Sequence, residues 1–332
     1  MATLEYVKLG STDLVVSQIG FGCEPIGGTD WGKVSDFDSV RSVRKALDLG
    51  VNFFDTADVY GLGYSEHILC KALGNARKEV VIATKFGVNW QLVRDTKRAK
   101  TFYDSSPAHI RKALEASLTR LKLECIPLYQ IHWPDPNTSI ADTMEELIRC
   151  KEAGKLLYIG CSNFSAGQVV QANQIHHLAS VQTLYNLIDR RAEEEALPCC
   201  GMLEIGSIAY GPLAQGFLTG KYGLDAEFGD NDRRSRLAHF HGENLKRNLR
   251  LVERIKEVGQ RYTKTPAQVA LRWVLDNLQI TCAIAGMKTP EQVEENVGAL
   301  GWRLASEDRS LLCTVLEEDA SLGKVRACRS PG

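Results

Sequence analysis

The fold is decided by one stretch of the chain, Val51-Asn52-Phe53-Phe54-Asp55-Thr56-Ala57-Asp58-Val59-Tyr60. The apolar run from Val51 to Phe54 is typical of a buried parallel strand. It ends in a carboxylate, Asp55, and Tyr60 follows five residues later in what we expect to be the connecting loop. Catalytic side chains lie at this end of the strands in barrels and open parallel sheets. On this stretch alone, a helix cap at Asp55 and a packing role for Tyr60 are the more frequent outcomes, so the other strands must decide.

The composition excludes several classes of function. The chain has 332 residues, of which 44% are hydrophobic and 24% charged, with a formal net charge of -1. This is ordinary globular composition, without the basic surplus of a nucleic-acid-binding protein. No apolar run approaches the roughly 20 residues needed to cross a bilayer. The charged first residues, Met1–Gly10, contain no signal-peptide pattern. We therefore expect a protein that binds neither nucleic acid nor membrane.

The ten cysteines do not predict a disulfide framework. The chain is large, no C-x-x-C pair is present, and most cysteines lie in apolar or helical contexts where they act as small hydrophobic residues. Reduced thiols in a cytoplasmic protein are the better interpretation.

Short apolar runs alternate with amphipathic helical patterns along most of the chain. An N-terminal β-hairpin is expected first, with strands at Tyr6–Leu9 and Leu14–Ile19. Eight runs then fit parallel strands: Ile19–Cys23, Val51–Phe54, Val80–Thr84, Ile126–Ile131, Leu156–Gly160, Ser180–Gln182, Ile205–Ala209 and Ile280–Ala285. Helical patterns between them include Phe37–Leu49, Ser65–Leu73, Pro107–Leu121, Ser139–Ala153, Ser165–Gln174 and Gln292–Leu300.

Eight strand–helix units predict an α/β fold, a (β/α)8 TIM barrel in which residues 1–332 form a single domain. A doubly wound, two-domain dehydrogenase is the main rival. It requires G-x-G-x-x-G after the first strand. Here the residues from Gly20 to Gly28 have the wrong spacing and include Pro25, and Gly61-Leu-Gly63 is incomplete. The dinucleotide-binding fingerprint is therefore missing.

Two connections are too long to be simple turns. One runs from Phe86 to Ser106 after the third strand, and the other from Gly211 to about Gly242 after the seventh. Both are expected on the face that carries active sites in this fold. The first contains the basic residues Arg94, Lys97, Arg98 and Lys100. A basic cluster is usually a solvated surface, but our hypothesis is that this loop narrows substrate choice and favours anionic substrates.

Polar residues recur where the predicted strands end. They are Asp55, Lys85, His132, Ser162, Asn163, Gln182, Tyr210 and Lys288. A single lysine or histidine in such a place is usually solvated or structural. Their recurrence changes this interpretation, because the carboxyl ends of all strands meet at one mouth of a barrel.

Four of these residues make chemical sense together. A tyrosine is a poor acid, and a nearby ammonium such as that of Lys85 should favour release of the phenolic proton of Tyr60. A carboxylate beside the lysine, Asp55, keeps it charged and oriented, and His132 could orient a carbonyl oxygen. The set suits protonation of a carbonyl oxygen as it becomes an alkoxide. Reduction needs a hydride that no side chain supplies, so a nicotinamide cofactor is implied.

The chain resembles the aldo-keto reductases over essentially its whole length. The matching segments are Asp55–Gly61, Ala83–Gly87, Leu128–Asp135, Gly160–Phe164, Gln182–Asn186, Tyr210–Gly216, Leu218–Lys221 and Gly286–Lys288 with Glu294–Asn296. The resemblance implies NADPH-dependent reduction of an aldehyde or ketone. It makes Tyr60 the general acid/base, Lys85 and Asp55 the residues that tune it, and His132 the residue that orients the carbonyl.

The same resemblance implies a cofactor site along the mouth of the barrel. The nicotinamide amide would bind Ser162, Asn163 and Gln182, with Tyr210 stacked on the ring. The loop from Tyr210 to Lys221 would wrap the pyrophosphate. The full set of implied cofactor residues is Ser162, Asn163, Gln182, Tyr210, Gly211, Pro212, Leu213, Gln215, Gly216, Lys221, Gly286, Lys288, Gln292, Glu295 and Asn296.

A helix start near Lys288 gives a physical reason for an anion site. Thr289 is expected as the N-cap, Pro290 as the first helical residue, and Gln292 as the partner that completes a capping box. A helix N-terminus beside a lysine binds anions. The resemblance makes this anion the 2′-phosphate of NADP, contacted by Lys288, Gln292 and Asn296. Lysine stands where many relatives have arginine, and it cannot bind a phosphate through two parallel hydrogen bonds as arginine does. This weakens the inference that NADPH is preferred over NADH.

Three other functions are less consistent with the sequence. A short-chain dehydrogenase needs Tyr-x-x-x-Lys, which does not occur. A metal-dependent hydrolase would have to use His239 and His241, which lie in the polar loop, or the helical pair His176 and His177. A regulatory barrel that binds cofactor without turnover, resembling the β subunits of potassium channels, stays open as the alternative.

The substrate is less well defined. Trp31, Phe86, Trp90, Trp133 and Phe240 are candidates for the pocket mouth, although ordinary packing explains each as well. A wall of aromatic side chains would suit a sugar or an aryl aldehyde. We expect no metal, and a monomer by default.

Overall fold

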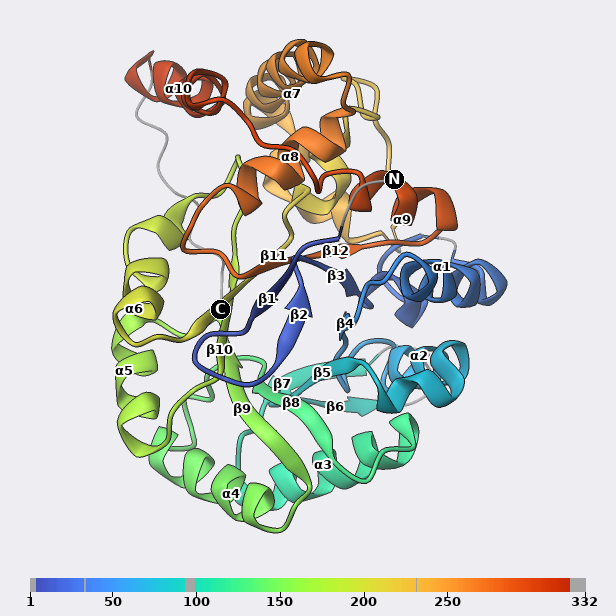
Figure 1. Cartoon of the computed structure of the whole chain (residues 1–332), viewed down its shortest axis with the longest axis vertical. Helices are drawn as coiled ribbons and strands as arrows, with labels where there is room; N and C mark the ends of the chain where they lie inside the picture. Colours follow the sequence, from blue (N-terminus) through green and yellow to red (C-terminus); the bar gives the residue numbers. More distant parts are fainter. Residues whose placement is uncertain (1–3, 33, 93–98, 231, 323–332) are drawn as a thin grey trace.

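The computed structural model describes residues 4–32, 34–92, 99–230 and 232–322. Its centre is a closed barrel of parallel strands, in which strands that follow one another in the sequence are neighbours (Figure 1). The barrel strands are β3 (Ile19–Gly22), β4 (Phe53–Asp55), β5 (Val81–Phe86), β8 (Ile126–Ile131), β9 (Leu156–Ser162), β10 (Ser180–Leu184), β11 (Gly206–Tyr210) and β12 (Cys282–Gly286). Each overlaps one of the eight predicted runs, so the predicted barrel is confirmed.

Helices surround the barrel, and the six predicted helical stretches are all present. They are α1 (Asp36–Asp48), α2 (Tyr64–Leu73), α3 (Pro107–Leu121), α4 (Ile140–Glu152), α5 (Ala166–Ile175) and α9 (Pro290–Val297). Four further helices are α6 (Ala196–Met202), α7 (Gly242–Tyr262), α8 (Pro266–Leu275) and α10 (Ser306–Leu322). Helices α7 and α10 pack against each other outside the ring (Figure 1).

Local sequence explains the helix boundaries. At the start of α3, the hydroxyl of Ser106 accepts a hydrogen bond from the backbone N–H of His109, and Pro107 occupies the first turn. Both features are favoured at an N-terminus, since the first N–H groups of a helix have no partner within it. The helix ends at Leu121, and its C-cap, Lys122, has a left-handed φ of 53°. Signals of this kind act over a few residues and can therefore be read from sequence.

The N-terminal hairpin closes the amino-terminal end of the barrel. Strands β1 (Tyr6–Lys8) and β2 (Val15–Ser17) are antiparallel, as predicted. Leu9 packs among side chains of the barrel interior. A Cβ atom at Gly206, the first residue of β11, would lie 2.6 Å from a methyl carbon of Leu9. The hairpin therefore fills this end of the barrel and leaves the carboxyl ends of the strands to form a site.

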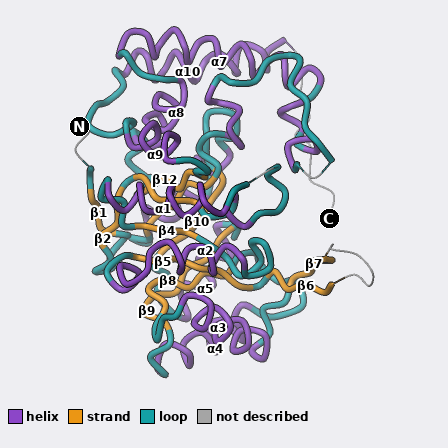
Figure 2. The backbone as a smooth tube through the Cα atoms, turned by 90° about the vertical axis from the view of Figure 1, so that its right-hand side faces the viewer, coloured by secondary structure: helices purple, strands orange, loops and turns teal. Residues whose placement is uncertain are grey.

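Both long connections contain structure of their own. The one after β5 includes an antiparallel pair, β6 (Val88–Leu92) and β7 (Ala99–Tyr103), which extends away from the barrel (Figure 2). The one after β11 contains three short 3-10 helices, η4 (Ala214–Thr219), η5 (Arg233–Arg236) and η6 (Ala238–Phe240). Among the helices within the described ranges, none is long and apolar enough to span a bilayer.

Candidate active site

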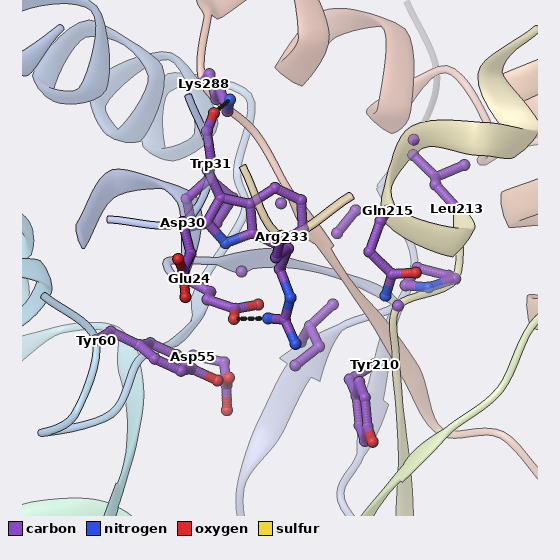
Figure 3. A pocket seen from close by; sticks show the side chains of 18 of the residues that line it. Glu24, Asp30, Trp31, Asp55, Tyr60, Tyr210, Leu213, Gln215, Arg233 and Lys288 are labelled. Carbon is purple, nitrogen blue, oxygen red and sulfur yellow. Dashed lines mark hydrogen bonds and ion pairs between the residues drawn. The ribbon is translucent and has the colours of Figure 1, made fainter. Parts of the chain in front are cut away.

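A cavity of about 640 Å³ lies at the carboxyl ends of the barrel strands (Figure 3). Its size is in the range of small-molecule and cofactor sites. Most residues singled out from the sequence line it: Trp31, Asp55, Tyr60, His132, Trp133, Ser162, Asn163, Gln182, Tyr210, Gly211, Pro212, Leu213, Gln215, Gly216, Lys221, Gly286, Lys288, Gln292, Glu295 and Asn296. Barrel closure thus brings together segments that are far apart in the sequence.

A buried ion pair lies at the floor of the cavity, where Asp55 lines it and Lys85 is fully enclosed beneath. Nζ of Lys85 lies 2.5 Å from Oδ1 of Asp55 and also donates to the carbonyl of Thr56 over 2.9 Å. Both charged side chains are almost fully buried. Removing two charges from water is costly unless they are paired and hydrogen-bonded, as they are here. Asp55 is therefore not a helix cap but the partner of Lys85.

Tyr60 lies above this pair. Nζ of Lys85 is 5.2 Å from the centre of the Tyr60 ring. Burial, together with the negative charges of Glu24 and Asp55, raises the pKa of Tyr60 well above its ordinary value. The expected easing of proton release is therefore not the net effect in this structure, because burial and the two carboxylates outweigh the opposing charge of Arg233 on the pKa of Tyr60. A phenol of high pKa remains protonated at neutral pH and can still protonate an alkoxide, which is a stronger base.

His132 faces Tyr60 across the cavity. The two rings meet edge to face, with their centres 5.6 Å apart. Burial and the nearby charge of Lys85 lower the pKa of His132 well below its ordinary value, so its imidazole is neutral at neutral pH. Its backbone is held on both sides, since its N–H donates to Phe86 over 2.8 Å and its carbonyl accepts from Asn163 over 3.0 Å. A fixed, neutral imidazole is suited to donating one hydrogen bond to a substrate oxygen.

The residues expected around the nicotinamide form one hydrogen-bonded group. The phenol of Tyr210 donates to Oδ1 of Asn163 over 2.8 Å, and the hydroxyl of Ser162 donates to the carbonyl of Gln182 over 2.9 Å. Asn163 has a left-handed φ of 62°, which asparagine tolerates better than most residues. Nε2 of Gln182 donates to Oδ2 of Asp55 over 2.7 Å. This group is therefore linked directly to the ion pair on the floor.

The chain turns sharply after β11. Gly211, Ala214, Gln215 and Gly216 all have positive φ, and three of them, Gly211, Gln215 and Gly216, line the cavity. Successive backbone N–H groups in such turns form concave sites for anions. Lys221 lines the same part of the cavity and adds a positive charge.

A second cationic region lies at the start of α9. Thr289 is the N-cap and accepts a hydrogen bond from the backbone of Gln292, as expected. The predicted capping box is incomplete, because the side chain of Gln292 accepts from the backbone N–H of Lys288 over 2.7 Å instead. Burial, followed by the charge of Arg234, lowers the pKa of Lys288 to about 8. A lysine in this state gains from an anionic ligand, which would stabilise its ammonium form.

Two loops meet above the cavity, and of the residues that join them Trp31 was singled out from the sequence, whereas Glu24, Asp30, Asp232 and Arg233 were not. Trp31 forms an isolated antiparallel bridge with Asp232. Arg233 donates from its backbone to the carbonyl of Asp30 over 3.0 Å, and its guanidinium pairs with Glu24 (Figure 3). No local pattern marks these contacts. The only signal was the unusual length of the loop after β11, together with its run of charged residues.

Several candidates for the pocket mouth lie elsewhere. Phe86 is fully buried in the core and stacks on Tyr129. Phe240 packs against other aromatic rings in the core, and Trp90 on β6 is not among the lining residues. These predictions were wrong for Phe86 and Phe240, because Phe86 packs on Tyr129 in the core and Phe240 packs on aromatic rings within the loop after β11, and neither lines the cavity. Arg94, Lys97 and Arg98 lie outside the described residues, and Lys100 is exposed on β7.

The histidines considered as metal ligands do not form a site. Burial lowers the pKa of His239 to about 4, and its ring lies against Phe217 and Phe240. Within the part of the chain that the structure describes, no cluster of three or more histidine, cysteine or acidic side chains could hold a metal ion. Nine cysteines are free thiols; Cys328 lies outside the described ranges.

Comparison with known proteins identifies the family. The model of the aldo/keto reductase family matches residues 18–317. The chain belongs to the aldo-keto reductase family. It is 36% identical to aldo-keto reductase YhdN of Bacillus subtilis (strain 168), over 96% of this chain and 95% of that protein. It is also 36% identical to probable aldo-keto reductase 1 of Glycine max, over 92% of this chain and 87% of that protein.

Solved aldo-keto reductases share the fold closely. The glycerol dehydrogenase AKR11B4 from Gluconobacter oxydans superimposes with a TM-score of 0.87 at 36% identity, covering 94% of this chain and 95% of that one. The holo form of aldo-keto reductase AKR11C1 from Bacillus halodurans gives a TM-score of 0.77 at 25% identity, with 94% and 96% covered. As a member of this family the protein is an oxidoreductase that acts on carbonyl compounds or alcohols.

Proposed function

We propose that the protein reduces an aldehyde or ketone to the alcohol, with NADPH as the hydride donor and Tyr60 as the proton donor. One observation carries the proposal: Tyr60 lines a cavity directly above the buried Lys85–Asp55 pair and faces the neutral ring of His132. This combination places a proton donor and a hydrogen-bond donor around one point, where a carbonyl oxygen would become negative.

The residues present fit a dinucleotide phosphate. When bound, NADPH supplies the hydride that no side chain can provide. Ser162, Asn163 and Gln182 would hold the nicotinamide amide beside Tyr210. The turn from Gly211 to Lys221 has the backbone geometry and the charge to bind a pyrophosphate.

The choice of NADPH over NADH rests on the start of α9. Lys288, Gln292 and Asn296 line the cavity beside a helix N-terminus, which carries a partial positive charge. The depressed pKa of Lys288 supports an anionic partner for this lysine. We therefore assign this corner of the cavity to the 2′-phosphate.

The chain's own residues account for the proton transfer. His132 orients the carbonyl oxygen toward the phenol of Tyr60. The phenol gives its proton to that oxygen as negative charge develops there. Lys85, held by Asp55, stabilises the phenolate that remains. The same groups work in reverse if an alcohol is the substrate, and one structural relative is named a glycerol dehydrogenase, so both directions require measurement.

The decisive experiment measures loss of NADPH absorbance over a panel of carbonyl compounds, including nitrobenzaldehyde, sugars and pyridoxal, with NADP⁺ and alcohols in the reverse direction. Turnover that disappears in Tyr60→Phe supports the proposal. Tight NADPH binding without oxidation across the panel would instead favour a cofactor-binding regulatory barrel. We also propose that residues 1–332 form one domain and that the protein is a cytoplasmic monomer, which fractionation and size-exclusion chromatography would test.

A further inference from the structure

Asp58 is a buried carboxyl group that the proposed reaction does not use. It lies in the loop after β4, two residues before Tyr60, and is 1% exposed. Its backbone N–H donates to the carbonyl of Lys85 over 3.2 Å, and its side chain does not line the cavity. Among the described residues, neither of its carboxyl oxygens has a hydrogen-bond partner. An ionised carboxylate in such a place is strongly destabilising.

Charged and titratable groups from four elements surround Asp58. The largest electrostatic influences come from Glu66 on α2, Arg120 on α3 and Lys85 on β5. Helices α2 and α3 pack against each other, and α3 also contacts β5 (Figure 1). The fourth group is Tyr129 on β8. Burial is the main cause that raises the pKa of Tyr129 well above its ordinary value, so its phenol is neutral.

Both cations of this group already have a carboxylate partner. Nζ of Lys85 lies 2.5 Å from Oδ1 of Asp55. Nε of Arg120 lies 2.5 Å from Oε2 of Glu66. Asp55, Asp58 and Glu66 therefore share two cations, and one of the three carboxyl groups has no positive charge to balance it. Burial makes an unbalanced negative charge unfavourable, which favours the binding of a proton.

Hydrogen bonding identifies the unbalanced carboxyl group as that of Asp58. Asp55 accepts from Gln182 over 2.7 Å, in addition to its pairing with a cation. Glu66 likewise accepts from Thr84 over 2.6 Å, in addition to its own cation. Hydrogen bonds to a carboxylate stabilise its charged form, and the carboxyl group of Asp58 receives none from the described part of the chain.

The surroundings of Asp58 affect its acidity in the same direction. Burial, followed by the charge of Glu66, raises the pKa of Asp58 well above its ordinary value. Arg120, the backbone N–H of Val59 and Lys85 oppose this shift without cancelling it. The N–H of Val59 lies near the carboxyl group but does not form a hydrogen bond with it. The charge balance, the hydrogen bonding and the pKa therefore agree on the neutral form.

We propose that Asp58 keeps its proton in the folded protein, so that Lys85 has one carboxylate partner and its charge remains available to Tyr60. This inference deepens the proposed function, since its kinetic consequence rests on Tyr60 as the proton donor. An ionised Asp58 would place a second negative charge near Lys85 and oppose formation of the Tyr60 phenolate. Asp58 is thus a positioning residue, which acts through Lys85 and does not touch the substrate.

Asp58→Asn tests the protonation state through stability, because asparagine keeps the shape of a neutral carboxyl group but cannot ionise. In the unfolded chain an aspartate has a pKa of about 3.9, so above that pH the wild type must take up a proton when it folds. The folding equilibrium constant of the variant, relative to that of the wild type, should therefore rise by about tenfold per pH unit between about pH 5 and 7. Urea denaturation measures both constants.

Asp13→Asn is the matched control. It makes the same change at an exposed carboxyl group in the turn of the N-terminal hairpin. This group is solvated in the folded and in the unfolded chain, so the relative stability of the control variant should not vary with pH over the same range. A relative stability of Asp58→Asn that is equally independent of pH would show that Asp58 is ionised in the folded protein, and would overturn the proposal.

Infrared spectroscopy of the wild type provides a second test, which does not depend on the folding of a variant. At neutral pH the protein should show the C=O band of a protonated carboxylic acid, and this band should shift when aspartate carries an isotope label in its carboxyl group. Labelled glutamate should leave the band unchanged, which separates Asp58 from Glu66. Absence of the band, or a band that follows the glutamate label, overturns the proposal.

The kinetic consequence is measured separately, with NADPH and a carbonyl substrate. The alkaline midpoint of the kcat profile should lie about one pH unit or more higher in Asp58→Asn than in the wild type, because only the wild type gains a negative charge near Lys85. Identical profiles would overturn the role assigned to Asp58. The stability and infrared tests require no turnover, so if both succeed and no carbonyl is reduced, only the proposed function fails.

Discussion

Gln182 donates a hydrogen bond from Nε2 to Oδ2 of Asp55 over 2.7 Å, while Oδ1 of the same carboxylate binds Lys85. The two residues are 127 positions apart in the sequence. Gln182, which is assigned to the nicotinamide, and Lys85, which supports the proton donor Tyr60, therefore bind the same carboxylate. Gln130 donates to the same Oδ2 over 3.2 Å but does not line the cavity.

This arrangement gives a paired prediction. Gln182→Met and Gln130→Met each remove one donor to a buried carboxylate, so both should lower kcat and shift its pH profile. Only Gln182→Met should weaken NADPH binding, since only Gln182 faces the cavity. Kinetic pH profiles and fluorescence titration with NADPH provide the measurements. Equal loss of NADPH affinity in the two variants would show that Gln182 acts on the cofactor only through Asp55.

Tyr60→Phe tests the proton donor. The phenol hydroxyl is removed while the ring remains, so we expect kcat for carbonyl reduction to fall by roughly 100- to 10,000-fold. The dissociation constant for NADPH should change little, because the phenol acts on the substrate oxygen. Stopped-flow reduction and equilibrium titration measure the two quantities. Loss of cofactor binding together with activity would mean that Tyr60 is misassigned.

The buried pair predicts a double-mutant cycle. Lys85→Met leaves the carboxylate of Asp55 buried without its partner, and we expect the free energy of unfolding to decrease by about 3–5 kcal/mol. Adding Asp55→Asn removes the stranded charge and should restore a large part of that loss, although activity stays low in both variants. Urea denaturation at neutral pH measures each step. Additive losses in the double variant would argue against direct coupling.

Lys288 makes the cofactor preference depend on pH. Its pKa of about 8 means that the ammonium form dominates below that pH in the free protein. A 2′-phosphate stabilises the ammonium, so NADPH must bind with proton uptake above about pH 8, and its affinity should fall by up to about tenfold per pH unit there.

NADH lacks this phosphate, so its affinity should not follow the same dependence. Titrations of both cofactors from about pH 7 to 9.5 would measure the ratio of the NADPH affinity to the NADH affinity. Lys288→Met should weaken NADPH binding and abolish the pH dependence of the ratio. If the ratio of the NADPH and NADH affinities is constant with pH in the wild-type protein, the assignment of the 2′-phosphate to Lys288 is wrong.

Much of the fold could be predicted from the sequence because the patterns that specify it are local. Ser106, Pro107 and Thr289 mark helix starts through contacts that span a few residues, and the apolar runs mark strands without knowledge of their neighbours. The hairpin β6–β7 was not recognised, because its exposed strands lack the alternation of a half-buried sheet and its residues were assigned to a loop.

Candidate site residues were found for a related reason. Strand ends converge at one mouth of a parallel barrel, so Asp55, Lys85 and His132 could be grouped from their positions alone. Phe86 and Phe240 could not be placed in this way, since an aromatic side chain at the mouth and one in the core have the same local sequence signature. The direction of the pKa shift of Tyr60 could not be predicted either, because it is a balance between burial and the charges of Glu24, Asp55 and Arg233.

The sequence by itself determined the order of strands and helices, the barrel, and the residues at its mouth, because strand period, helix caps and the geometry of parallel strands are properties of short segments. The tertiary structure alone decided which side chains contact one another across the mouth of the barrel. Glu24 and Arg233 are 209 positions apart, and their pairing depends on how two loops pack over the cavity. Contacts of this kind arise from the simultaneous packing of many residues, and no local pattern encodes them.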